Sequence, residues 1–107
     1  MKKYCFAVLL ILSMILVGCN PDTEGKTYSI IYDANGATYG FPPTDNKRYT
    51  SGKNVKVLGK NNMTKDGYEF QYWNTKKQGD GDKYNPGDTI TVKNINIRLY
   101  AIWVILL

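Results

Sequence analysis

Histidine is absent from the 107-residue chain, and its only two cysteines lie near the N-terminus. Without imidazole, the chain lacks the side chain that most often transfers protons at neutral pH and the most common zinc ligand. Cys5 lies within an apolar segment and Cys19 follows it, so the rest of the chain has no thiol for disulfides, catalysis or metal ligation. We therefore expect no enzymatic activity, no metal site and no cofactor.

Long apolar segments are also missing, because the longest one covers only residues 6–17. As a helix this segment would measure about 18 Å, compared with about 30 Å for the hydrocarbon core of a bilayer. Lys2 and Lys3 precede it, which is the pattern of a secretory signal peptide. The segment therefore predicts export of the chain.

The four residues Leu16, Val17, Gly18 and Cys19 resemble the lipobox of bacterial lipoproteins. This resemblance implies cleavage before Cys19 and attachment of a diacylglyceryl group to its sulfur. An ordinary secretory signal and an uncleaved membrane helix are the alternatives. With lipidation, the anchor is expected to be stable, because two or more acyl chains hold a protein at a bilayer far better than one.

The composition predicts four segments: residues 1–18 as signal peptide, 19–27 as lipidated cysteine and flexible tether, 28–103 as a folded domain, and 104–107 as an apolar tail. The tether lacks apolar residues to bury. The tail either extends the last strand or is what remains of a shortened gene.

An alternation of apolar and polar residues dominates the predicted domain, which indicates strands. In the clearest example, Tyr68, Phe70 and Tyr72 occupy one face, and Trp73 belongs to the opposite face. No long helix is expected, although one short helical turn is possible, so the fold class is mostly β or α+β. Strands are expected around residues 28–33, 55–57, 68–73, 89–92 and 95–103, with a long surface loop over 74–88.

Because the domain contains no disulfide, its aromatic rings have to form much of the core. The mature chain has eight Tyr, two Trp and two Phe. The residues that we expect in the core are Tyr32, Tyr68, Phe70, Trp73, Leu99 and Trp103.

Several turn and strand motifs occur in the order seen in a known family. They are Tyr32-Asp33-Ala34-Asn35-Gly36, Lys65-Asp66-Gly67-Tyr68-x-Phe70, Trp73-Asn74-Thr75 with Gly79, Gly81, Tyr84 and Gly87-Asp88 behind it, and Leu99-Tyr100-Ala101-Ile102-Trp103. Together they resemble the Listeria/Bacteroides repeat, also called the internalin B-type repeat. The chain departs from the family by having Tyr72 where glycine is usual and by containing one module. The resemblance implies a small β-grasp, ubiquitin-like domain of surface proteins without catalytic residues.

Residues 46–65 contain six basic side chains and no acidic one. One interpretation is a binding surface for anionic polysaccharide, teichoic acid or lipid headgroups. The other is an edge strand on which lysines prevent aggregation. The candidate binding residues are Lys47, Arg48, Lys53, Lys56 and Lys60.

Two further features are candidate binding sites. The Asp80-Gly81-Asp82 segment with nearby Asp88 invites a calcium loop, but Tyr84 and Asn85 stand where such a loop needs Asp or Asn and then Gly. A solvated turn is the better interpretation. Exposed rings are a second possibility, since a tyrosine can stack on sugars or on a partner protein. The candidates are Tyr39, Tyr49 and Tyr84.

These observations predict a noncatalytic, lipid-anchored module on the bacterial cell envelope that contacts a protein or an envelope component, as an adhesin does. The alternative is a binding module for carbohydrate or an anionic polymer. Nucleic acid is not an expected partner, because the chain carries an export signal. The sequence leaves open which membrane holds the anchor.

Overall fold

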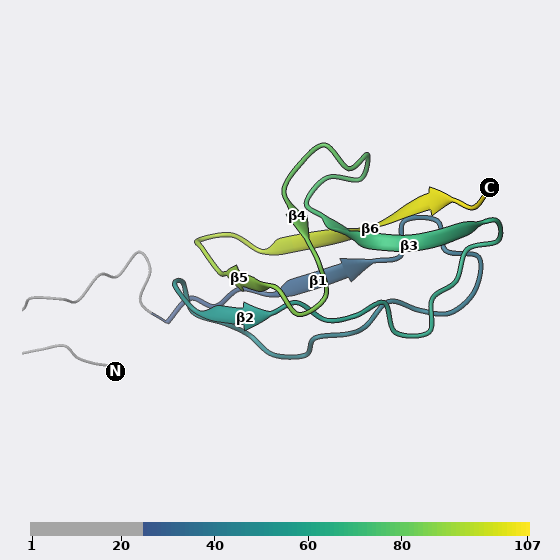
Figure 1. Ribbon diagram of the computed structural model, residues 1–107. Coiled ribbons are helices and arrows are strands. Elements are labelled where there is room, and N and C mark those ends of the chain that lie inside the picture. Colours follow the sequence, from purple (N-terminus) through teal and green to yellow (C-terminus); the bar gives the residue numbers. More distant parts are fainter. Residues whose placement is uncertain (1–24) are drawn as a thin grey trace, which may run out of the picture.

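The computed structural model describes residues 25–107, whose strands form two sheets (Figure 1). The larger sheet has the order β1, β6, β3, β4, and the smaller one pairs β2 with β5. No helix or helical turn occurs among the described residues, so the mostly-β class is confirmed. The strands are β1 Ile30–Asp33, β2 Asn54–Lys56, β3 Tyr68–Asn74, β4 Lys83–Tyr84, β5 Thr89–Thr91 and β6 Ile97–Ile105.

The predicted signal peptide and the predicted lipobox lie outside the described residues. This also holds for Cys19 and for residues 20–24 of the tether.

Strand β6 organises the larger sheet, because it has a neighbour on each side. It pairs in parallel with β1, where Ile30 lies opposite Ile97 and Tyr32 opposite Leu99. On its other side it pairs antiparallel with β3. The predicted alternation along β1 and β6 therefore puts the apolar residues of both strands on one inner face, since residues opposite each other share a face.

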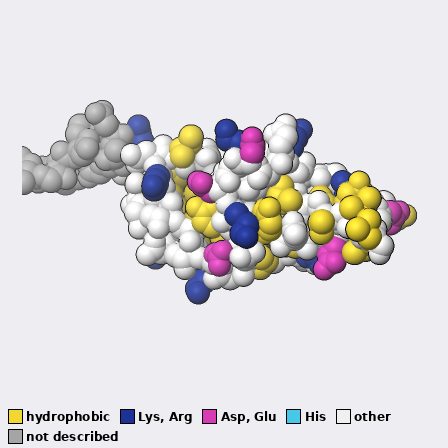
Figure 2. All heavy atoms as spheres, turned by 45° about the horizontal axis from the view of Figure 1, so that its top comes forward, with side chains coloured by type: hydrophobic (Ala, Val, Ile, Leu, Met, Phe, Trp, Pro, Cys, Tyr) yellow, Lys and Arg dark blue, Asp and Glu magenta, His cyan; other side chains and the backbone are white. Residues whose placement is uncertain are grey.

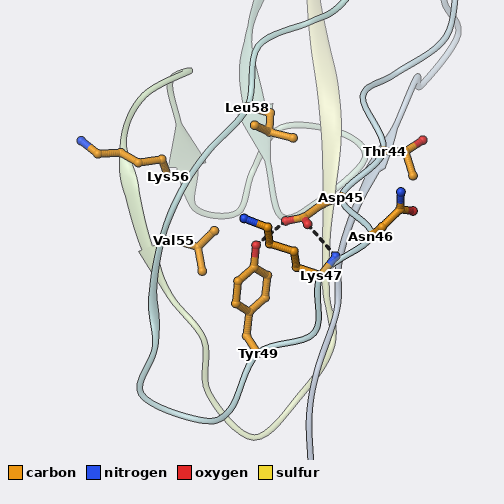
Figure 3. Close-up of a pocket in the computed structure, with 8 residues that line it drawn as sticks. All are labelled: Thr44, Asp45, Asn46, Lys47, Tyr49, Val55, Lys56 and Leu58. Atoms are coloured by element: carbon orange, nitrogen blue, oxygen red, sulfur yellow. Dashed lines mark hydrogen bonds between the residues drawn. The ribbon is translucent and has the colours of Figure 1, made fainter.

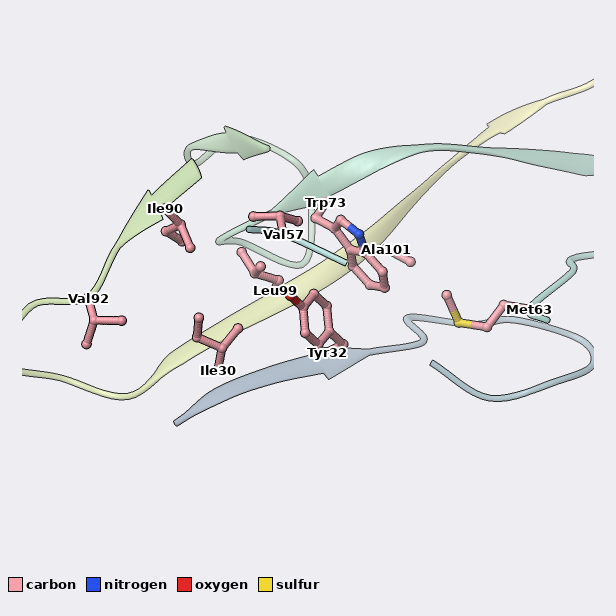
Figure 4. Close-up of a cluster of buried hydrophobic side chains, with 9 residues drawn as sticks. All are labelled: Ile30, Tyr32, Val57, Met63, Trp73, Ile90, Val92, Leu99 and Ala101. Atoms are coloured by element: carbon pink, nitrogen blue, oxygen red, sulfur yellow. The ribbon is translucent and has the colours of Figure 1, made fainter. Parts of the chain in front are cut away.

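The core lies between this inner face and the smaller sheet (Figure 4). Val57 and Met63 come from the chain between β2 and β3 and cover the inner face of the larger sheet. The buried apolar residues are Ile30, Tyr32, Val57, Met63, Trp73, Ile90, Val92, Leu99 and Ala101.

Aromatic rings form a continuous edge-to-face series through this core. The ring of Trp73 lies 4.9 Å from that of Tyr32 and 5.1 Å from that of Phe70, and Phe70 lies 5.9 Å from Trp103. Each tryptophan also donates its Nε1–H to a backbone carbonyl, that of Leu58 for Trp73 at 2.8 Å. Edge-to-face pairs each add about 0.5–1.5 kcal/mol beyond the area they bury.

A bulge in β3 reverses the face that the sequence alternation assigned to Trp73. The register with β6 shifts between Phe70 and Tyr72, which makes Gln71 the extra residue. Phe70 and Trp73 consequently contact each other on the inner face, and the expectation that they occupy opposite faces is wrong. Tyr72 lies across from Ile102, with the Lys83 ammonium 4.9 Å from its ring centre.

The predicted core residues do not all lie inside. Tyr32, Trp73 and Leu99 are buried, and Phe70 and Trp103 pack partly buried against them. Tyr68 has 37% of its surface exposed, because it lies at the end of the β3–β6 strand pair, beyond the buried residues.

The C-terminal tail is partly strand. Val104 lies opposite Glu69 and Ile105 opposite Tyr68, and the Leu106 N–H donates to the Gly67 carbonyl at 2.9 Å. The first half of the predicted tail therefore extends the last strand.

The loop predicted over residues 74–88 is held by a buried side chain. Asn74 is 1% exposed, and its Oδ1 accepts hydrogen bonds from the N–H groups of Lys76 and Gly81, each at 2.9 Å. Its Nδ2 donates to the carbonyls of Gly79 and Gly81 at 3.2 and 3.4 Å. The short strand β4 interrupts this loop and pairs with the end of β3.

Candidate functional site

The basic residues of the 46–65 stretch do not form one patch. Lys60 donates from Nζ to the Met63 carbonyl at 2.9 Å, so its ammonium group is hydrogen-bonded within its own loop. Arg48 bonds to Thr27, and Lys53 lies in the turn before β2. Of the candidate residues, only Lys47 and Lys56 line a common hollow. The predicted basic patch is therefore split over several parts of the surface.

This hollow has a volume of about 480 Å³ and lies between β2 and the loop that precedes it (Figure 3). In Figure 3 the Lys47 side chain extends from that loop toward β2, whereas Lys56 extends away from the hollow. The apolar part of its lining comes from Val55, Leu58 and the ring of Tyr49. The full lining is Thr44, Asp45, Asn46, Lys47, Tyr49, Val55, Lys56 and Leu58.

Asp45 is the organising group of the hollow, and sequence reasoning missed it. Its Oδ2 accepts a hydrogen bond from the Tyr49 hydroxyl at 2.8 Å, and its Oδ1 accepts one from the Lys47 backbone N–H at 2.9 Å. Burial, together with the hydrogen bond and charge of Asp45, raises the pKa of Tyr49 to about 12. Burial of Tyr32 raises the pKa of that phenol as well, and the charge of Asp45 adds to this effect. Both phenols therefore stay neutral at physiological pH.

Lys47 and Asp45 give the hollow one charge of each sign, because Lys56 extends away from it. Within residues 25–107, the ion pair between Arg98 and Asp33 at 3.2 Å is the only one formed, so Lys47 forms no ion pair with a described carboxylate. Asp45 already accepts two hydrogen bonds from its own loop.

A second hollow of about 140 Å³ shares Thr44 and Asp45 with the first and adds Pro42 and Pro43.

A different surface lies at the end of the domain where β3 begins and β6 ends. We call it the apolar tip, and two of its residues, Tyr39 and Phe41, come from the loop after β1 and are 65% and 76% exposed. Tyr39 exchanges backbone hydrogen bonds with Thr64, just before β3. The members of the apolar tip are Tyr39, Phe41, Tyr68, Ile105 and Leu106.

Figure 1 places the described start of the chain and the beginning of β3 at opposite ends of the domain. Figure 2 shows a broad apolar area at the end away from the grey segment. Of the three rings considered for stacking, Tyr39 is well exposed, whereas Tyr49 and Tyr84 are half-buried. Of the aromatic candidates from the sequence, only Tyr39 is exposed enough to stack on another molecule. Phe41, which was not among them, is also well exposed.

The described part of the chain offers no three carboxylates close enough to hold a metal ion. The Asp82 segment is closed by backbone contacts instead, because Thr75 and Asp82 exchange two hydrogen bonds at 3.0 and 2.9 Å. No helix among residues 25–107 is long and apolar enough to cross a membrane.

The fold and its turn motifs define a small mostly-β module of the kind found as a repeat in larger proteins. The sequence pattern of the Listeria-Bacteroides repeat domain matches residues 28–102, and the chain belongs to this family. The resemblance seen in its motifs is thereby confirmed.

Two curated relatives come from Evansella cellulosilytica. One, named "Putative Gly-rich membrane protein", is 39% identical over 77 residues, which are 71% of this chain. The other, named "Putative membrane protein", is 37% identical over 79 residues, or 73% of this chain. The chain spans only 9% and 12% of the length of these relatives. No solved structure is significantly similar to it.

Proposed function

We propose that this chain is a noncatalytic module of the bacterial cell envelope, which a lipid at Cys19 attaches to a membrane and whose apolar tip contacts a partner protein. The observation that carries the proposal is the apolar tip, which lies at the end of the domain opposite the start of the described chain (Figure 1). The envelope location is supported by the two relatives, which are named "Putative Gly-rich membrane protein" and "Putative membrane protein".

The lipid anchor rests on the lipobox-like residues before Cys19. Substitution Cys19→Ala removes the sulfur that would carry the diacylglyceryl group. We expect this variant to leave the detergent phase in a phase-partition assay, while the unmodified chain stays there. Partitioning that does not change would contradict lipidation.

The apolar tip suits a protein contact because its most exposed ring has a fixed backbone. The Phe41 N–H donates to Asn62 Oδ1 at 2.9 Å, and Asn61 Nδ2 donates to the Phe41 carbonyl at 3.0 Å. A partner therefore need not order this loop on binding, and that lowers the entropic cost of the complex. Exposed aromatic rings at such positions are typical anchors of protein interfaces.

Pull-down from intact cells tests the tip, with the mature chain as bait. We expect Phe41→Ser to lose the captured protein and Ile31→Ser to retain it. Ile31 is a matched control because it is a large apolar residue, 40% exposed, on the outer side of β1. Equal capture by both variants would remove the apolar tip from the proposal.

An anionic polysaccharide is the second candidate partner, and the hollow beside β2 favours it. Lys47 provides positive charge there, and Tyr49, Val55 and Leu58 provide apolar surface for a sugar ring. A salt titration separates the two candidates, since binding of a charged polymer weakens steeply with salt and an apolar contact does not. Lys47→Glu should abolish polymer binding and leave the pull-down of a protein through the tip unchanged.

A further inference from the structure

We propose that the end of the domain nearest the tether is a docking surface for anionic phospholipid headgroups. We call this surface the basic end and define it by Lys26, Arg48, Lys53, Lys93 and Ile95. The inference rests on the membrane association proposed above, and it adds a defined orientation of the domain on the bilayer.

Two of these lysines are neighbours because their turns are joined by backbone hydrogen bonds. The Gly52 N–H donates to the Val92 carbonyl at 2.7 Å, and the Val92 N–H donates to the Lys53 carbonyl at 2.8 Å. Lys53 and Lys93 thus project from adjacent turns at one end of the smaller sheet, and both are exposed.

The other two basic residues, Lys26 and Arg48, lie at the same place because Arg48 is hydrogen-bonded to Thr27, the neighbour of Lys26 in the chain. Arg48 donates from Nε to Thr27 Oγ1 at 2.9 Å and from Nη2 to the Thr27 carbonyl at 3.1 Å, next to Lys26. The Ser29 N–H donates to Asn96 Oδ1 at 2.9 Å, which ties the start of the domain to the turn before β6. The four cations therefore belong to one surface.

The charge of this surface is not neutralised by the described residues. Arg48 bonds only to neutral oxygens of Thr27 and Ser29. The three segments that build the basic end, residues 25–29, 48–54 and 92–97, contain no Asp or Glu. Asp22 and Glu24 precede it along the chain and reduce the local positive charge without reversing it. In Figure 2 basic side chains lie at the end of the domain that adjoins the grey segment.

Ile95 adds an apolar group to this charged surface. It is 68% exposed in the turn that a bridge between Lys93 and Ile95 closes. An apolar side chain among basic ones is the arrangement with which proteins lie at a membrane interface, because the apolar group enters the headgroup layer while the cations contact phosphates.

The position of the predicted anchor brings this surface to the lipid. The six peptide bonds from Cys19 to Gly25 span at most about 22 Å when the chain is fully extended. A tether of this length gives the basic end a high effective concentration at the bilayer, so contacts that are weak individually suffice. The apolar tip, at the other end of the domain, then faces away from the lipid (Figure 1).

Amine acetylation quantified by mass spectrometry tests this orientation. The full chain, isolated from bacterial membranes, is reconstituted into vesicles of phosphatidylcholine with phosphatidylglycerol or of phosphatidylcholine alone. At low salt we expect labelling of Lys26, Lys53 and Lys93 relative to Lys77 to fall about fivefold in the anionic vesicles only and to recover at high salt. Lys77 is exposed in the loop between β3 and β4 and provides the internal reference.

Two variants with the same charge change separate local docking from a general charge effect. Lys53→Glu should restore most labelling of Lys26 and Lys93, whereas Lys76→Glu should leave their protection unchanged. Ile95→Asn should reduce the protection about twofold, because it removes the apolar contact and retains every charge. Full protection of Ile95→Asn, or equal protection by soluble polyphosphate, would overturn the assignment to a lipid surface.

Failure of the anchor and failure of the docking give different results. A chain that leaves the vesicle pellet shows that membrane attachment is wrong. If the chain remains in the pellet while Lys26, Lys53 and Lys93 are labelled as fast as Lys77, the docking surface is wrong and the anchor stands. Protection that is equal in neutral and anionic vesicles also overturns the proposed lipid chemistry.

Discussion

Trp73 and Phe41 show the contrast between the inner face of the sheet and the apolar tip. Trp73 is fully buried, in contact with two other rings and hydrogen-bonded through its indole N–H. Phe41 is 76% exposed, although hydrogen bonds fix its backbone as well. The difference teaches that burial and exposure divide the aromatic residues of this chain into those that stabilise the core and those that are free for the contact proposed above.

The unequal lengths of the strands explain why the two regions differ. β6 has nine residues, but β1 pairs only with its first four, Ile97–Tyr100. The β3–β6 strand pair therefore extends past the layer that covers the inner face, and Tyr68 and Ile105 at its end remain exposed. Sheet geometry thus accounts for the exposure of the strand residues of the apolar tip, whereas Tyr39 and Phe41 come from the loop after β1.

The largest effect is expected from Trp73→Ala. Removing a fully buried aromatic side chain costs about 3–5 kcal/mol, a large part of the stability of a small domain. The substitution also leaves the Leu58 carbonyl without its donor. Urea unfolding followed by circular dichroism measures the loss. Trp73→Phe is the control, since it keeps a ring in the cluster and should lose clearly less; equal losses would mean that the ring contacts do not hold the core.

Asn74→Ala should have the next largest effect, because Asn74 is buried without being part of the apolar core. The substitution leaves the N–H groups of Lys76 and Gly81 without an acceptor, and we expect a loss of about 2 kcal/mol. Hydrogen exchange should accelerate at these two amides and stay unchanged in β6. Asn85→Ala, at an exposed position of the same loop, should be near neutral. A similar loss in both variants would show that the loop, rather than the buried amide, carries the effect.

The sequence alone predicted the strands that show a regular alternation of apolar and polar residues. The alternation around Ile30 and Leu99 predicted β1 and β6 with their buried faces, and the turn motifs predicted the family. The face of Trp73 could not be predicted, because the bulge at Gln71 depends on pairing with β6 rather than on the sequence of β3 alone. An alternation of apolar and polar residues does not show where a bulge adds an extra residue to a strand.

The candidate surfaces were harder to predict than the fold. The six basic residues are close in sequence, but the folded chain sends Lys60 to a carbonyl and separates Arg48 from Lys56. Asp45 lies in a polar segment that gave no signal, and its role depends on Tyr49, four residues away, being turned toward it. A linear charge count does not show which cations share a surface, because backbone pairing between distant turns decides that.

Tyr49→Phe is expected to have a smaller effect that depends on pH. The pKa of Tyr49 is raised from 10.0 to about 12, so the fold favours the neutral phenol. Its contribution, about 1 kcal/mol for one hydrogen bond, is therefore complete below pH 10 and is lost as pH rises toward 12. Urea unfolding of both proteins at pH 8 and pH 11.5 should show a difference that shrinks at the higher pH. A constant difference would indicate that packing of the ring, not the bond to Asp45, holds the loop.

The smallest effect on stability is expected from Phe41→Ser, which tests the contrast between the two regions directly. Phe41 has little buried surface to lose, so unfolding in urea should change by less than about 0.5 kcal/mol. Phe70→Ser is the matched variant, because the same ring then leaves the contacts with Trp73 and Trp103 and should cost about 3 kcal/mol. If Phe41→Ser destabilises the domain as much as Phe70→Ser, the ring at the tip is a structural residue and its exposure has no role in binding. A small stability change with a lost pull-down would instead separate the contact surface of this module from the core that supports it.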